Sequence, residues 1–130
     1  MATIRPFKGF RPTPELCSKV AALPYDVMTS KEAREMVKND PYSFLHVDRA
    51  EIDLPENVDI YSKEVYEKAA SNLNKMIEDK VLIQDSKPVF YIYSLTMNGR
   101  EQIGLVVCTS IDEYLNNTIK KHEFTRADKE

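Results

Sequence analysis

The fold is decided by the stretch Val89-Phe90-Tyr91-Ile92-Tyr93-Ser94-Leu95-Thr96-Met97-Asn98-Gly99-Arg100-Glu101. Residues 89–97 are rich in β-branched and aromatic side chains, and a second such run extends from about Glu101 to Thr109. Asn98-Gly99 between them is the strongest turn signal in the chain, because both residues tolerate a positive φ. The stretch therefore predicts an antiparallel β-hairpin. Because residues 89–93 are apolar at consecutive positions, we expect both faces of the hairpin to be covered.

A long amphipathic helix is predicted on the N-terminal side of this hairpin, over about Ile60 to Asp79. Its apolar positions recur three and four residues apart and so fall on one helix face; they are Val65, Tyr66, Ala69, Ala70, Leu73, Met76 and Ile77. We expect this helix to cover one face of the hairpin. Nothing in the sequence repeats, and helical and strand patterns alternate irregularly. The predicted fold class is therefore α+β, with an antiparallel or mixed sheet, one long helix and shorter helices.

The N-terminal half predicts shorter elements. Thr29 followed by Glu32 has the spacing of a capping box, which would begin a helix that runs to Asn39. The remaining expectations are a strand over 4–10 that Arg11-Pro12 ends, a helical turn within 15–22, a turn-rich extended segment over 23–27, a strand over 42–47, an exposed loop over 48–59 and a short strand over 81–83.

Length and composition bound the class of protein. The chain has 130 residues, 42% of them hydrophobic and 30% charged, which is ordinary for a globular domain. No apolar run approaches the ~20 residues of a membrane span, and the N-terminus lacks a secretory signal, so we predict a cytoplasmic protein with no membrane partner. A net charge of −3 argues against a nucleic-acid partner. Cys17 and Cys108 are predicted to be buried thiols without a function.

The C-terminus reads as an interrupted element. Thr125 with Asp128 is typical of a helix start, yet only two residues follow. We therefore expect residues 1–119 to form an N-terminal α+β domain and residues 120–130 to begin a following region of a longer protein.

The densest titratable chemistry lies in that final segment. The chain has glycine only at positions 9, 99 and 104, which excludes a Gly-rich phosphate loop within it. Glu123 beside His122 is a candidate general base, with Lys121 able to hold an anionic substrate, but a solvated run of charges explains the same residues. Thr125 is a candidate phosphate ligand and equally a helix N-cap.

A second candidate site lies in Leu23-Pro24-Tyr25-Asp26-Val27. Asp26 follows a proline with fixed φ and could accept a hydrogen bond from a substrate or bind magnesium, with Tyr25 beside it. Alternatively, Asp26 bonds nearby backbone amides while Tyr25 fills the core. The two histidines, His46 and His122, have no ligand-spaced partners, so no zinc site is predicted.

Several strings together resemble one known family: Ile4-Arg5-Pro6-Phe7, Pro24-Tyr25-Asp26-Val27, Pro41-Tyr42-Ser43-Phe44-Leu45-His46-Val47, and His122-Glu123 with Thr125 and Lys129-Glu130. The chain resembles the N-terminal part of the family called domain of unknown function 1015. That family is similar, later in its sequence, to ParB and sulfiredoxin-like proteins, through an Asp-Gly-His-His-Arg box that this chain lacks. This chain has Ala22-Leu23 where the family commonly has Ala-Pro.

The resemblance implies two alternative functions. Free-serine kinases of the ParB-like superfamily carry a catalytic glutamate in a His-Glu string, which is similar to His122-Glu123. The longer protein would then be a nucleotide-dependent kinase of a small metabolite, using ATP or ADP with magnesium, while this chain alone needs no cofactor. The alternative is a non-catalytic scaffold or protein-interaction module that contacts a partner or the remainder of its own chain.

Because the chain lacks a phosphate loop, we predict that it binds ATP and ADP at best weakly. Isothermal titration calorimetry on residues 1–130 should give no binding in the micromolar range. Micromolar affinity would contradict the prediction and would place a nucleotide site in this part of the protein.

Overall fold

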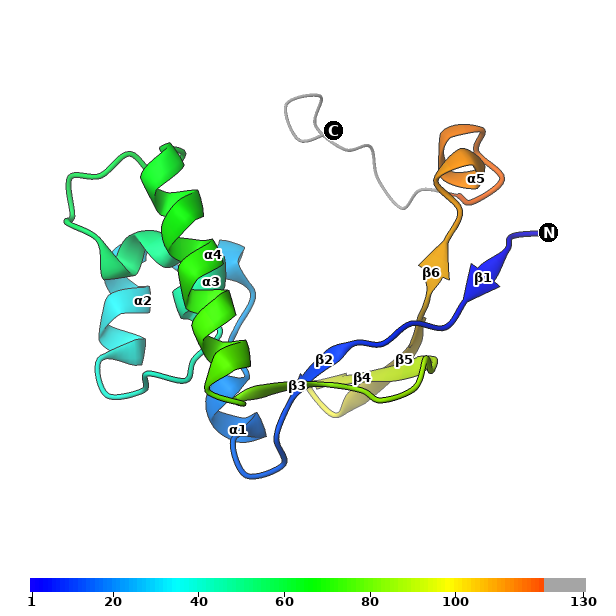
Figure 1. Ribbon diagram of the computed structural model, residues 1–130, viewed down its shortest axis with the longest axis horizontal. Coiled ribbons are helices and arrows are strands. Elements are labelled where there is room, and N and C mark those ends of the chain that lie inside the picture. Colours follow the sequence, from blue (N-terminus) through cyan, green and yellow to red (C-terminus); the bar gives the residue numbers. More distant parts are fainter. Residues whose placement is uncertain (121–130) are drawn as a thin grey trace. The chain divides into compact units, whose positions relative to one another are not determined.

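A computed structural model describes residues 1–120 (Figure 1). The chain forms two compact units, and each is described by itself. The helical unit is Phe10–Gln84, and the hairpin unit combines Met1–Gly9 with the described residues from Asp85 onwards. Helices and antiparallel strands are both present, which confirms the α+β class. The boundary predicted near residue 119 falls at the end of the described residues and stays a prediction.

The helical unit is built mainly from short helices. Its elements are β2 (Phe10–Pro12), α1 (Cys17–Val20), the 3-10 helix η1 (Tyr25–Val27), α2 (Ser30–Val37), α3 (Leu45–Asp48), the 3-10 helix η2 (Ala50–Asp53), α4 (Lys63–Glu78) and β3 (Leu82–Gln84). The strands β2 and β3 pair antiparallel, with Phe10 opposite Gln84 and Pro12 opposite Leu82. The predicted strand over 4–10, with a break at Arg11-Pro12, is therefore wrong: Ile4–Arg5 forms the separate strand β1, and β2 begins at Phe10 and continues through Pro12. Pro12 is accommodated because it is the last residue of a short strand.

The predicted long helix is α4, which has 16 residues and buries Val65 and Met76. Its apolar side packs within the helical unit, where it contacts α3, η2 and β3. Two hydrophobic clusters form the core. One contains Val20, Met76, Val81 and Leu82, and the other contains Ala33, Val37, Leu45 and Ile52.

The capping box at the start of α2 is confirmed. The hydroxyl of Thr29 accepts a hydrogen bond from the backbone N–H of Glu32, and the Glu32 carboxylate accepts one from the backbone N–H of Thr29 at 2.7 Å. The backbone and hydroxyl of Thr29 hold the pKa of Glu32 below its usual value. The motif satisfies two amides that the first helical turn leaves without partners, so the start of α2 could be read from sequence.

Residues 42–47 do not form the predicted strand, because Leu45–Asp48 is the helix α3. Phe44 and Val47 are three residues apart, lie on one side of the helical turn and pack on the cluster around Val20. Leu45, only 1% exposed, belongs to the other cluster. Consecutive apolar residues therefore serve two cores on either side of a short helix, a pattern that a strand covered on both faces shares.

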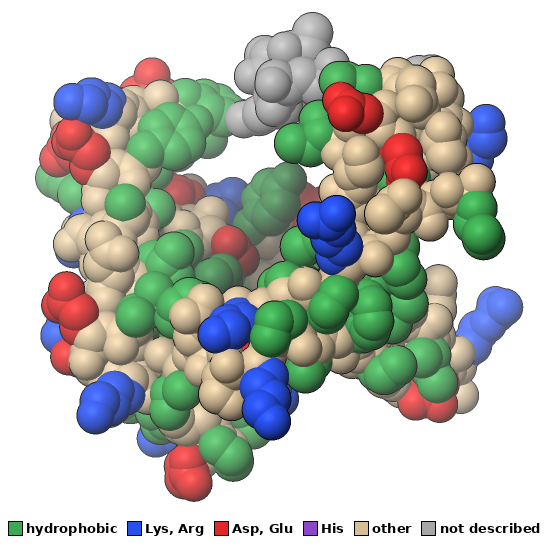
Figure 2. Space-filling view, turned by 45° about the vertical axis from the view of Figure 1, so that its right-hand side comes forward, with side chains coloured by type: hydrophobic (Ala, Val, Ile, Leu, Met, Phe, Trp, Pro, Cys, Tyr) green, Lys and Arg blue, Asp and Glu red, His purple; other side chains and the backbone are tan. Residues whose placement is uncertain are grey.

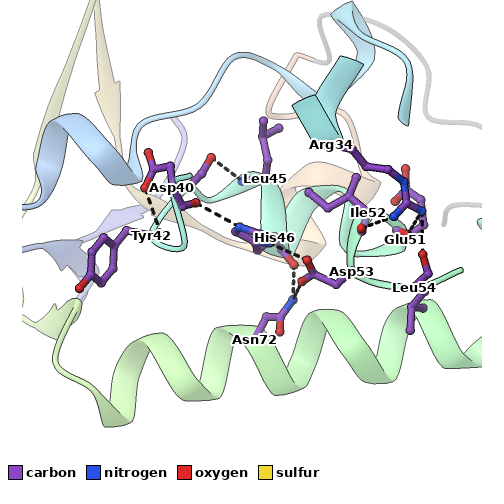
Figure 3. A network of polar contacts seen from close by, with 11 residues as sticks. Arg34, Asp40, Tyr42, Leu45, His46, Glu51, Ile52, Asp53, Leu54 and Asn72 are labelled. Carbon is purple, nitrogen blue, oxygen red and sulfur yellow. Dashed lines mark hydrogen bonds and ion pairs between the residues drawn. The ribbon is translucent and has the colours of Figure 1, made fainter. Parts of the chain in front are cut away.

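The predicted exposed loop over residues 48–59 is also wrong in its first part, because η2 buries Ala50, Glu51 and Ile52. Arg34 on α2 holds this segment in place. Its guanidinium donates to the backbone carbonyls of Glu51 and Leu54, each at 2.7 Å, and to that of Ile52 (Figure 3). Arg34 thus gives hydrogen bonds to three backbone carbonyls, which apolar side chains around this turn could not provide.

The buried Glu51 carboxylate has its own partners. It accepts a hydrogen bond from the Ser30 hydroxyl at 2.8 Å and forms an ion pair with Arg49, with 2.9 Å between Nε and Oε1. Arg49 also donates to the Ser30 hydroxyl at 2.9 Å. These contacts tie η2 to the first turn of α2, and they compensate the desolvation of a carboxylate inside the unit.

The hairpin unit consists of β1 (Ile4–Arg5), β4 (Tyr91–Met97), β5 (Arg100–Val106), β6 (Cys108–Thr109) and α5 (Ile111–Leu115). Strands β4 and β5 form the predicted hairpin, with Tyr91 opposite Val106 and Met97 opposite Arg100. Asn98 and Gly99 have φ values of 53° and 75°, as the turn signal requires. A second antiparallel pair joins β1 to β6, with Ile4 opposite Thr109.

Tyr91 anchors the base of the hairpin. Its hydroxyl accepts a hydrogen bond from the Gly9 backbone N–H at 2.7 Å and donates to the Asp85 carboxylate at 2.6 Å. The ring lies against Phe7, with 5.0 Å between centroids. A Cβ at position 9 would lie 2.8 Å from the Tyr91 hydroxyl oxygen. A side chain at position 9 would therefore have to displace the Tyr91 hydroxyl from these hydrogen bonds.

The predicted cover of the hairpin by the long helix would join two separate units and stays a prediction. Large apolar side chains on both faces of β4 and β5 are exposed, and none of the described residues of the hairpin unit is buried. The prediction assumed that a consecutive apolar run marks a strand buried on both faces. Cys17 and Cys108 are likewise exposed rather than buried.

The turn geometry predicts that Gly99→Val weakens the hairpin by about 1 kcal/mol or more, because a β-branched residue resists a positive φ. Amide hydrogen exchange of β4 should then be faster. Gly104→Val is the matched control, since Gly104 lies within β5 and a Cβ there has no neighbour closer than 3.9 Å. Equal exchange rates in wild type and Gly99→Val would contradict the turn assignment.

The contacts of Arg34 predict that Arg34→Lys lowers the free energy of unfolding by about 1–3 kcal/mol. A single ammonium cannot reproduce the guanidinium fork, so buried carbonyls of η2 lose their donors. Urea denaturation measures the change. Lys38→Arg on the exposed side of the same region should alter stability by less than about 0.5 kcal/mol. Equal stability of Arg34→Lys and wild type would show that water replaces these bonds.

Candidate functional site

A pocket with both polar and apolar lining lies within the helical unit, beside α3, η2 and α4. Its volume is about 630 Å³. The lining residues are Pro41, Tyr42, His46, Asp53, Lys68, Asn72, Lys75, Met76, Asp79 and Val81. In Figure 3, Asn72 projects from α4 toward His46 and Asp53, which come from α3 and η2. Three separate elements thus bring polar groups to one place.

His46 is held at both ring nitrogens. Nδ1 lies 2.8 Å from Asp53 Oδ1, and Nε2 lies 3.2 Å from the backbone carbonyl oxygen of Asp40 (Figure 3). The side chains of His46 and Asp53 are 18% and 24% exposed. A histidine that acts as general base needs one nitrogen free to receive a proton. Here both nitrogens face protein oxygens, so the geometry favours a fixed ring that shapes the pocket.

Asn72 completes this arrangement from α4. Its amide nitrogen donates to the backbone carbonyl of His46 at 2.6 Å and to Asp53 Oδ2 at 2.7 Å. Both carboxylate oxygens of Asp53 therefore have a partner, one in His46 and one in Asn72. The result is a cross-link between α3, η2 and α4 in which the polar groups are preorganised.

Two lysines from α4 also line the pocket. Lys75 donates to Asp79 at 2.7 Å, and this hydrogen bond, together with the charge of Asp79, raises the pKa of Lys75. Lys68 lies seven residues earlier on the same helix face and is half-buried. Within residues 1–120, the structure gives Lys68 no hydrogen bond or ion pair. It is the pocket's cationic group available to a bound anion.

The sequence-predicted residues Tyr25 and Asp26 lie elsewhere. Both belong to η1 and do not line this pocket. Tyr25 is 60% exposed, so the alternative in which it fills the core is wrong. Its backbone carbonyl accepts a hydrogen bond from Arg49 at 3.3 Å, which ties η1 to the Glu51 network. The proposed binding role of Tyr25 and Asp26 stays a prediction.

The other predicted site residues, Lys121, His122, Glu123 and Thr125, lie outside the described residues. Their catalytic and phosphate-binding roles therefore stay predictions. Within residues 1–120 there is no group of three acidic, histidine or cysteine side chains arranged to hold a metal ion.

The pocket was not predicted from the sequence. Two features of the sequence could have indicated it. His46 and Asp53 are seven residues apart, and Lys68, Asn72 and Lys75 lie on one face of α4. The spacing of His46 and Asp53 acquires meaning only when α3 and η2 are known to be consecutive helical turns. Because residues 42–47 were predicted as a strand, the two side chains could not be placed together.

A second surface feature lies in the hairpin unit. Six apolar side chains of β4 and β5 are 52–72% exposed: Ile92, Tyr93, Leu95, Met97, Ile103 and Leu105. Figure 2 shows hydrophobic side chains at many places on the visible surface. By register, Tyr93, Leu95 and Met97 lie on the same face as Val106, and this set is called the hairpin face below. The opposite face carries a hydrogen bond between Ser94 and Glu101 at 2.7 Å.

Comparison with known proteins places the chain in a family. The family model described as protein of unknown function (DUF1015) matches residues 4–130. Searches of curated proteins and of solved structures gave no match. Over residues 1–120, helices long and apolar enough to cross a membrane are absent. Because the match covers nearly the whole sequence, the chain belongs to the DUF1015 family.

Proposed function

We propose that this chain is a non-catalytic protein-interaction module that associates with a second copy of itself through the hairpin face. The observation that carries the proposal is the contrast in burial between the two units. Every buried apolar side chain of residues 1–120 belongs to the helical unit. An isolated two-stranded hairpin is at best marginally stable in water and needs further strands or a packing partner.

The hairpin face has the composition of a contact surface. Tyr93, Leu95 and Met97 follow one another along this face of β4, and Val106 lies diagonally from Tyr93. The β5 residues opposite the three β4 side chains are Gly104, Gln102 and Arg100. The opposite face also has exposed apolar side chains, Ile92, Ile103 and Leu105, but toward the turn it is polar, with the Ser94–Glu101 hydrogen bond and Thr96. A contiguous exposed apolar patch is typical of an interaction site, whereas single exposed apolar side chains are normal on a protein surface.

A second copy is the partner that the charge pattern favours. Strand β4 has no charged residue, and β5 has its charges only next to the turn, at Arg100 and Glu101. In a two-fold, antiparallel arrangement, the turn of one copy faces the base of the other, so like charges do not meet across the centre. Apolar side chains of one copy then cover those of the other.

The size of the hairpin face predicts a weak association. Its four side chains expose on the order of 100 Å² each, or roughly half of the ~800 Å² per partner in a standard stable interface. We therefore expect a reversible dimer with a dissociation constant in the micromolar range, not a permanent one.

The alternative of a nucleotide-dependent metabolite kinase rests on Glu123 and His122, which lie outside the described residues. Contact of this chain with the remainder of a longer protein is likewise a hypothesis from the sequence. Neither has a specific observation among residues 1–120 in its favour, so both stay predictions.

The proposal predicts that the wild-type chain dimerises with rising concentration in sedimentation equilibrium, and that Leu95→Lys weakens the dimer by about 10-fold or more. A lysine in the centre of the hairpin face would have to bury its ammonium against apolar side chains of the other copy. The unfolding transition of the helical unit should not change, because Leu95 contributes nothing to either buried cluster.

Thr96→Lys is the matched control, since it adds the same charge to the neighbouring position of β4 on the opposite face. This variant should dimerise like wild type. A chain that stays monomeric at several hundred micromolar would overturn the proposal. Equal weakening by both lysine substitutions would show that the hairpin face is not the contact surface.

A further inference from the structure

The pocket of the helical unit is lined by two lysines and two aspartates, and these charged groups are not all paired with one another. Its two carboxylates are both engaged, Asp53 with His46 and Asn72, and Asp79 with Lys75. Lys68 is half-buried at the same pocket, and the contacts among residues 1–120 include no partner for it. A lysine loses hydration when it is partly buried, and an anionic ligand restores the lost interactions.

Part of the pocket lining is apolar. Pro41, Tyr42, Met76 and Val81 form this part, and Met76 and Val81 are continuous with the first hydrophobic cluster. A methionine side chain packs well against aromatic rings. The pocket therefore joins an apolar wall to a cationic group, with a volume of about 630 Å³ that suits a small molecule.

The polar part of the lining, formed by His46, Asp53 and Asn72, is fixed in advance. The His46 ring has a partner at each nitrogen, and the Asn72 amide spans from His46 to Asp53. A ligand would therefore meet groups that are already ordered, and little conformational entropy would be lost on binding. Asn72 and Lys68 are four residues apart on α4 and so lie on the same helix face.

We propose that this pocket binds a small molecule that combines an aromatic or apolar ring with an anionic group, a carboxylate or a phosphate. Lys68 is the counter-ion of the anionic group, and the ring packs against the apolar residues that line the same pocket. The proposal concerns the helical unit alone and does not depend on association through the hairpin face.

Phenyl phosphate and phenylacetate test the proposal, with benzyl alcohol as the neutral probe of the same ring. Titration followed by two-dimensional ¹H–¹⁵N NMR should shift the backbone amides of Tyr42, His46 and Asp53 and the side-chain amide of Asn72. Either anion should bind at least about 10-fold more tightly than benzyl alcohol, the usual effect of one charge-assisted contact. Comparison of the two anions identifies which acid group the pocket prefers.

Lys68→Gln should weaken binding of the preferred anion by about 10-fold and leave benzyl alcohol unaffected. Because Lys68 has no hydrogen bond or ion pair with another described residue, this variant should melt like wild type. Lys63→Gln on the same helix is the control, since Lys63 pairs with Glu67 and does not line the pocket. The proposal fails if neither anion shifts these signals, if benzyl alcohol binds as tightly as the anions, or if Lys68→Gln binds them unchanged.

Discussion

Apolar burial in this chain is confined to Phe10–Gln84, and the rest of the structure depends on that constraint. Two small clusters divide the available apolar side chains between them, and α3 is shared by both. Neither cluster is large, so the helical unit relies on the polar contacts that join its helices. The hairpin unit has instead a set of hydrogen bonds around Tyr91 and an exposed apolar surface.

Polar side chains do much of the work of positioning in the helical unit. Arg34 and the Glu51 network fix η2 from the side of α2, while Asn72 fixes it from α4 through Asp53. Side chains of α2 and of α4 therefore hold η2 from two sides. This explains how a run with four acidic residues between 48 and 56, which looks like an exposed loop, comes to bury Glu51 and to shape a pocket wall.

Local signals in the sequence were sufficient for some elements and insufficient for others. The capping box at Thr29, the period of α4 and the Asn98-Gly99 turn are each encoded within a few residues, and all three are present as predicted. The short helix α3 was mistaken for a strand because an apolar run that serves two cores has no clear period. The buried η2 could not be predicted, since its burial depends on Arg34 from another element. The pocket is lined by residues of both α3 and η2, so it could not be predicted while these two elements were not recognised as helical turns.

The pairing of β2 with β3 has a consequence for the order of folding. These strands bring the first and last residues of the helical unit together, and just beyond them the Asp85 backbone N–H donates to the Gly9 carbonyl at 3.0 Å. The two sequence segments of the hairpin unit, residues 1–9 and 85–120, are thus separated by a complete intervening unit. Because the helices contact near neighbours in sequence, we expect the helical unit to form first. Formation of the helical unit brings residues 9 and 85 together, and the chain entropy for closing this long loop is lost at that step. Phe7 and Val89 can then pair with little further loss of chain entropy.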